Sequence, residues 1–180
     1  MEKVKDLIIR YIILLLISIP NVKLFYFLFS FLTTYSVFFI LSFFSNPILE
    51  GTTIIINSFK IELIDACIAG SAYFLLFALN ILTPIKLKKR IFSLLFLFSS
   101  FFVINVVRII LFSFFLLKVF SLYKTLHLIF WYLLSSFIVA CLWFLNIKIF
   151  GIKEIPFYSD AKFLIRVIKS RKKIKKTEGG

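Results

Sequence analysis

One stretch of this chain, from Leu24 to Phe44, contains no charged residue and constrains the fold more than any other feature. As a helix that rises ~1.5 Å per residue it would be about 31 Å long, which matches the ~30 Å hydrocarbon core of a bilayer. The rest of the chain is similar, because 62% of its 180 residues are hydrophobic and only 17% are charged. Too little polar surface exists to cover a compact water-soluble globule. We therefore expect an all-α polytopic membrane protein.

Three more apolar runs are long enough to cross a bilayer, and another run is shorter. The short run, Leu7 to Ile19, contains Arg10 and is followed by Pro20, so it is either a tilted span or an interfacial helix. We expect about five transmembrane helices, with the role of the first left open, in one catalytic domain that covers residues 1–150. The three longer runs are Cys67 to Ile85, Ile91 to Leu117 and Leu126 to Ile147.

The positions of the basic residues predict which ends of these helices face the cytoplasm. Lys86 to Arg90 carries four cations, and residues 151–180 form a tail rich in Lys and Arg, so both should be cytoplasmic. The loop 45–66 would then lie outside, and the sequence predicts a multi-pass protein of the cell membrane. This pattern accounts for the formal net charge of +14 and argues against nucleic-acid binding.

The outer loop has a pattern of its own. Thr52 to Ile56 and Lys60 to Ile64 are rich in β-branched residues, and the turn at 57–59 between them predicts a small extracytoplasmic β-hairpin. A lone hairpin is marginal in water, so we expect it to lie against the helix ends. Asp65 is a candidate N-cap for the next helix, which would place Cys67 in a first helical turn, where the helix dipole favours a thiolate.

Three residues that can take part in chemistry are predicted at one depth in the membrane. Cys67 begins a span at the outer surface, and His127, the only histidine, opens the last span from the same side. Arg108 follows Ile91 by 17 residues, which places it about 26 Å up a ~30 Å membrane core. The three helices are consecutive and joined by short loops, so we expect the three side chains to be neighbours.

Each of these residues also has an ordinary structural explanation. A lone thiol is commonly a small core residue, a histidine at a helix start is commonly interfacial, and Arg108 can snorkel or pair with Asp65 or Glu62. Their convergence favours chemistry, because thiol, imidazole and guanidinium are the groups that a cysteine acyl transferase requires. The second cysteine, Cys141, lies about 21 Å deeper than His127 and is expected only to pack.

The chain around these residues resembles a known family. The segments that carry the likeness are Ile61 to Gly70, Asn105-Val106-Val107-Arg108-Ile109 and His127-Leu128-Ile129-Phe130-Trp131. In this order they resemble the exosortase/archaeosortase family of membrane cysteine transpeptidases, and the short length is similar to small archaeal, pacearchaeosortase-like members. The resemblance covers roughly residues 51–143. It departs at Ile68, where many relatives have Ser, and at Phe130, where many have Gly.

The resemblance implies a thiol protease (EC 3.4.22-like) that needs no cofactor or metal. It implies cleavage of exported proteins near a C-terminal signal, made of a short motif, a transmembrane helix and a basic end, on the outer face of the membrane. Transfer to an acceptor would follow, and for archaeal relatives that acceptor is thought to be a lipid anchor. Cys67 would be the nucleophile, Arg108 would stabilise the oxyanion or thiolate, and His127 would act as general acid and base.

Two further residues are placed to support this site. Asn105 lies one helical turn before Arg108 and is expected to orient it, whereas Trp131 follows His127 by one turn and either stacks on it or belongs to the aromatic belt.

Other classes fit the sequence less well. A zinc peptidase would need more ligands than one His and one surface Cys, and a rhomboid-like protease would need a Gly-x-Ser-x-Gly segment, which is absent. A small transporter, channel or assembly factor remains the alternative, because Arg108 would suit an anion pathway. The sequence shows no internal repeat or pair of broken helices of the kind that such transporters use.

Overall fold

Helices make up most of the part of the chain that the structure describes. The computed structural model describes residues 2–18, 23–56, 59–118, 133–152, 162 and 165. The basic tail from 151 onward therefore lies almost entirely outside the described residues. The helices are α1 (Glu2–Ser18), α2 (Lys23–Ser42), α3 (Asp65–Ile68), α4 (Gly70–Leu82), α5 (Leu87–Lys118) and α7 (Ser135–Ile149).

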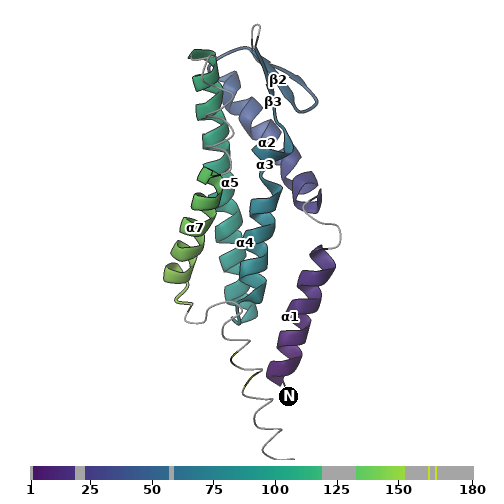
Figure 1. Cartoon of the computed structure of the whole chain (residues 1–180). Helices are drawn as coiled ribbons and strands as arrows, with labels where there is room; N and C mark the ends of the chain where they lie inside the picture. Colours follow the sequence, from purple (N-terminus) through teal and green to yellow (C-terminus); the bar gives the residue numbers. More distant parts are fainter. Residues whose placement is uncertain are drawn as a thin grey trace, which may run out of the picture.

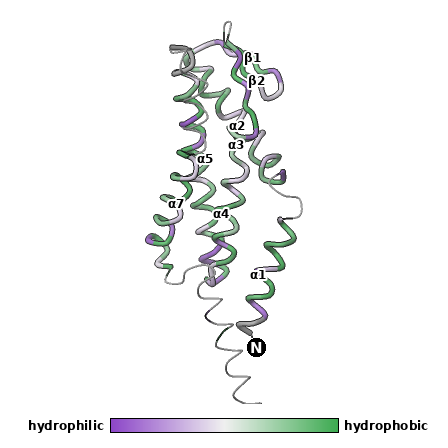
Figure 2. Tube along the Cα trace, in the orientation of Figure 1, coloured by the Kyte–Doolittle hydropathy of each residue, from purple (hydrophilic) through white to green (hydrophobic). Residues whose placement is uncertain are grey.

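Three described segments are long and apolar enough to cross a membrane. They are Lys23–Ser42, the combined α3 and α4 from Asp65 to Leu82, and Leu87–Phe114, whereas α7 is apolar but shorter. Figure 2 shows that apolar residues predominate along these helices, with shorter hydrophilic stretches between them. Large apolar side chains also face outward, and Phe27 is 82% exposed, as expected of a surface that contacts lipid. The expected membrane protein is thus supported with three candidate spans, and the expected fifth run lies only partly within the described residues.

Helix α1 is attached to one end of the bundle. Figure 1 shows it beside the lower part of α4, with the N-terminus near the end at which α4 stops. Arg10 is only 3% exposed and donates from Nη1 to the carbonyl of Leu82 at 2.7 Å, and its Nε lies 3.2 Å from Asp6. Arg90 donates to the carbonyl of Thr83 at 3.0 Å. Two guanidinium groups therefore satisfy carbonyls where α4 ends, which is where the helix dipole favours positive charge.

A small antiparallel sheet lies at the opposite end of the bundle (Figure 1). Its strands are β1 (Ile48–Glu50), β2 (Thr53–Ile56) and β3 (Phe59–Glu62), in the order β1-β2-β3. The predicted hairpin is confirmed as β2 and β3, which pair with Ile54 opposite Ile61. The first strand was not predicted. It pairs with β2 through a turn at Gly51, whose φ of 63° suits a residue without a Cβ.

Two clusters of buried apolar residues hold these elements together. The first, an aromatic cluster in the middle of the bundle, combines aromatic and aliphatic side chains, with Phe29 stacked on Tyr73 at a centroid distance of 3.6 Å and Phe101 edge-on to Tyr73 at 4.8 Å. The second lies under the sheet and joins β2 to α2, α3 and α5. Its fully or nearly fully buried members are Val37, Leu41, Ile54, Ile56, Leu63, Cys67, Val106 and Ile109.

Three buried polar side chains link α4, α5 and α7 near the end where α1 attaches. Asn80 donates to the Ser93 hydroxyl at 2.6 Å, and this hydroxyl donates to Asn146 Oδ1 at 2.8 Å. All three residues have no exposed surface. Because water does not compete in such surroundings, each bond holds two helices in a defined register.

Replacing the central hydroxyl tests this network. Ser93→Ala breaks both bonds and leaves two buried amides unsatisfied, so we expect it to lower stability in mild detergent by roughly 1 kcal/mol. Ser99→Ala, at an exposed position of the same helix, should leave the thermal unfolding midpoint unchanged. Equal midpoints for the two variants would show that the network contributes no stability.

Candidate functional site

The predicted third span is not one continuous helix, because it breaks at Ala69. This residue has φ 55° and ψ 42°, the left-handed conformation, and it separates α3 from α4. For a residue with a Cβ this conformation costs on the order of 1–2 kcal/mol, so the surrounding structure must hold it in place. The break leaves Cys67 on a one-turn helix of its own, directly after the sheet.

The start of α3 differs from the prediction by one residue. Asp65 was expected to be the N-cap, but the N-cap is Ile64, whose carbonyl accepts the Cys67 N–H at 2.8 Å. Ile64 has no side-chain acceptor, so the first turn lacks a side-chain cap. Asp65 is instead the first residue of the helix, where a carboxylate still interacts favourably with the dipole. Cys67 does lie in the first turn, as expected.

The thiol of Cys67 is covered. It was predicted to lie at the outer surface, within reach of a peptide carbonyl, but only 5% of the residue is exposed. The cover is the cluster under the sheet, in which Ile54 and Leu63 are also buried. The β-sheet therefore does more than lie against the helix ends, because apolar side chains of β2 share this buried cluster with the cysteine and with residues of α2 and α5.

Asn105 connects Cys67 to Arg108. Its Nδ2 donates to the carbonyl of Cys67 at 3.0 Å, and its Oδ1 accepts from Nη2 of Arg108 at 2.7 Å. The carbonyl of Cys67 needs such a partner because the last carbonyls of a helix have none within the helix, and α3 ends one residue later. The break at Ala69 thus creates the acceptor that Asn105 satisfies.

Arg108 continues this network to α7. Its Nη1 donates to the hydroxyl of Ser135, and the arginine is 5% exposed. Hydrogen bonds that the guanidinium donates to an amide oxygen and to a hydroxyl oxygen fix its plane between α5 and α7. The structure therefore brings Cys67 and Arg108 into one network across α3, α5 and α7. Their catalytic roles stay predictions, and His127 and Trp131 lie outside the described residues.

Ser135 was not identified from the sequence. The signal available was Ser135-Ser136, a pair of small polar residues inside the apolar run 126–147. Such pairs in transmembrane helices commonly donate back to their own helix, so they do not by themselves mark a partner on another helix.

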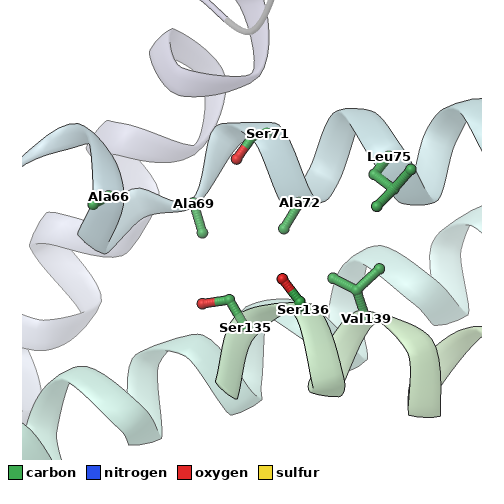
Figure 3. Close-up of a pocket in the computed structure, with 8 residues that line it drawn as sticks. All are labelled: Ala66, Ala69, Ser71, Ala72, Leu75, Ser135, Ser136 and Val139. Carbon is green, nitrogen blue, oxygen red and sulfur yellow. The ribbon is translucent and has the colours of Figure 1, made fainter. Parts of the chain in front are cut away.

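A groove of about 190 Å³ opens beside this network, between α3–α4 and α7. Figure 3 shows three alanines on one wall facing two serines on the other, so little side-chain bulk fills the space. Ser135 belongs to both the groove and the hydrogen-bond network. The lining residues are Ala66, Ala69, Ser71, Ala72, Leu75, Ser135, Ser136 and Val139.

The described residues contain no group of three or more His, Cys, Asp or Glu side chains that would hold a metal ion. Comparison of the chain with protein-family models, curated proteins and solved structures gives no match. The chemistry of this site is therefore inferred from its own residues.

The cover over Cys67 predicts slow alkylation. In a Cys141→Ser background, N-ethylmaleimide should modify Cys67 slowly in mild detergent and quickly in SDS. Ile54→Ala thins the cover and should raise the rate in mild detergent roughly tenfold by favouring local opening. Ile55→Ala, on the same strand but outside the buried cluster, is the matched control and should leave the alkylation rate unchanged. If Cys67 of the Cys141→Ser protein were alkylated as fast in mild detergent as in SDS, the thiol would not be covered.

Proposed function

We propose that this chain is a membrane cysteine transpeptidase of the exosortase/archaeosortase type. It would cleave the C-terminal sorting signals of exported proteins and transfer the new C-terminus to an acceptor, such as a lipid anchor. The observation that carries the proposal is the network in which Asn105 bonds both to the backbone of Cys67 and to Arg108. Asn105 thereby ties Arg108 to the backbone of the residue that carries the thiol, 41 positions earlier in the sequence, which supports the proximity that acyl transfer requires.

The reaction assigns one role to each group. His127 takes the Cys67 proton, the sulfur forms a bond to the carbonyl carbon of the substrate, and Arg108 stabilises the oxyanion. The C–N bond then breaks, and His127 returns the proton to the leaving amine. The acceptor attacks the thioester, His127 removes its proton, and the thiol of Cys67 is regenerated when the C–S bond breaks. Arginine suits this environment because it keeps its charge when it is largely desolvated.

The proposal requires the sheet to move. Because the cluster around Ile54 covers Cys67, a substrate carbonyl reaches the sulfur only after this cover is displaced. Covering the thiol between turnovers would protect it from oxidation. It would also keep the thiol from attacking peptide bonds other than that of the substrate.

The sheet would face the outside of the cell. This orientation rests on the four cations of residues 86–90, at the end of the bundle opposite the sheet, because cytoplasmic loops are enriched in Lys and Arg. Exported substrates would therefore meet the sheet and Cys67 on the face that they reach after translocation, and the basic C-terminal tail would remain in the cytoplasm.

Substitution of each cysteine tests the nucleophile. Cys67→Ala should leave a co-expressed precursor uncleaved, because no thioester can form. Cys141→Ala should process it normally, since Cys141 lies on the exposed face of α7 and outside the network. Mass spectrometry of the precursor termini measures both outcomes, and normal processing by Cys67→Ala would exclude the cysteine mechanism.

Arg108→Lys separates catalysis from membrane anchoring. Lysine keeps the charge but loses the planar fork that reaches two partners, so turnover should fall by about a hundredfold while the protein still accumulates in the membrane. The cleavage rate divided by the amount of membrane-inserted protein is the quantity to compare. A rate near that of the parent would remove Arg108 from the catalytic residues and favour a structural or transport role.

A further inference from the structure

Among the described residues, the edge of β3 that faces away from β2 has no strand paired with it, and β3 leads into the short helix that carries Cys67. The N–H of Leu63 bonds to the carbonyl of Thr52 at 3.0 Å, which extends the β2–β3 register by one pair. Hydrogen-bonded pairs alternate along an antiparallel ladder, so the backbone N–H and C=O groups of Ile61 and Phe59 also point toward β2. The N–H and C=O groups of the two residues between these positions must then point away from the sheet.

Those two residues are Lys60 and Glu62, and both side chains are exposed. The carbonyl of Glu62 accepts the N–H of Ile64 at 3.2 Å. Within the described part of the chain, the N–H and C=O of Lys60 and the N–H of Glu62 have no partner. This edge therefore offers a donor, an acceptor and a second donor, which is the pattern that one additional strand satisfies.

The other edge of the sheet is a weaker candidate. The same alternation leaves only the N–H and C=O of Leu49 pointing away from β1, because Ile48 and Glu50 face β2. Strand β1 follows α2, whereas β3 runs directly into α3, and Cys67 comes five positions after Glu62. A strand added to β3 would lie beside the connection that carries the nucleophile.

We propose that an extended segment of the substrate polypeptide adds to the free edge of β3 as a fourth strand. The inference rests on the proposed transpeptidase activity and identifies how its substrate is held. A substrate strand carries alternating N–H and C=O groups, which would be the hydrogen-bond partners for the backbone groups of Lys60 and Glu62. Its pairing engages the sheet that covers Cys67, so binding is coupled to the element that must move.

The edge also predicts what kind of segment binds. Phe59 and Ile61 lie on the same side of β3 and are half-buried, while Lys60 and Glu62 lie on the other side and are exposed. Side chains of neighbouring strands meet on the same face. The substrate segment should therefore alternate apolar residues beside Ile61 with polar or charged residues beside Lys60 and Glu62.

Proline at the edge tests the backbone contact. Lys60→Pro removes an N–H that points away from β2, so the existing ladder keeps its bonds and only the added strand loses one. We expect cleavage of the co-expressed precursor to slow by about tenfold or more. Leu49→Pro removes the equivalent N–H at the other edge and should cleave at nearly the parental rate. Lys60→Gln keeps the N–H without the charge, so it should slow cleavage much less than Lys60→Pro does.

Photo-crosslinking provides a readout that does not depend on turnover. With benzoylphenylalanine at position 60 in a Cys67→Ala background, the precursor should crosslink, and at position 49 it should not. The strand addition would be overturned if Lys60→Pro cleaved at the parental rate, or if position 60 crosslinked to a second copy of this chain instead of the precursor. In either case an inactive Cys67→Ala would still support the cysteine mechanism. Cleavage by Cys67→Ala would instead overturn the proposed function itself.

Discussion

The side-chain amide of Asn105 joins two parts of the molecule that the helix break would otherwise leave separate. An amide carries both a donor and an acceptor, and here each is used once, toward the carbonyl of Cys67 and toward Arg108. Asn105 is 1% exposed, so water does not weaken either bond. No apolar residue would hold the broken end of α3 and an arginine at the same time, and Asn105 is one of the acceptors, with Ser135, that offset the desolvation of the buried guanidinium.

Several parts of this arrangement were predictable because they depend on local pattern or on depth. Membrane insertion follows from the length of the apolar runs, and the hairpin follows from β-branched runs separated by turn residues. Asn105 and Arg108 face the same way because they are one helical turn apart. The proximity of Cys67 to Arg108 follows from counting residues across a bilayer of known thickness. Each of these inferences needed only a period or a distance along the chain.

The features that were missed depend on tertiary contacts. Strand β1 has only three residues and gains its stability by pairing, so its own sequence gives a weak signal. The left-handed conformation falls on Ala69, although the glycine beside it would adopt this conformation at lower cost, and no propensity rule predicts that choice. Ser135 was missed because its partner is on another helix. The burial of Cys67 was missed because the outer segment was expected to lie at the helix ends, whereas its apolar side chains pack in the same buried cluster as Cys67.

The left-handed residue also determines how Cys67 is held against the rest of the molecule. A continuous helix would couple Cys67 rigidly to α4, whose Tyr73 is locked in the aromatic cluster. With the helical hydrogen bonding interrupted at Ala69, α3 is instead held by two clusters: Cys67 packs with residues of β2, α2 and α5, and Ile68 packs in the aromatic cluster of the bundle. The position of Cys67 is thus set by two packed clusters, one on each side of α3, and not by the axis of α4. A change in the packing of either cluster would therefore change both the exposure of the thiol and its position relative to Arg108.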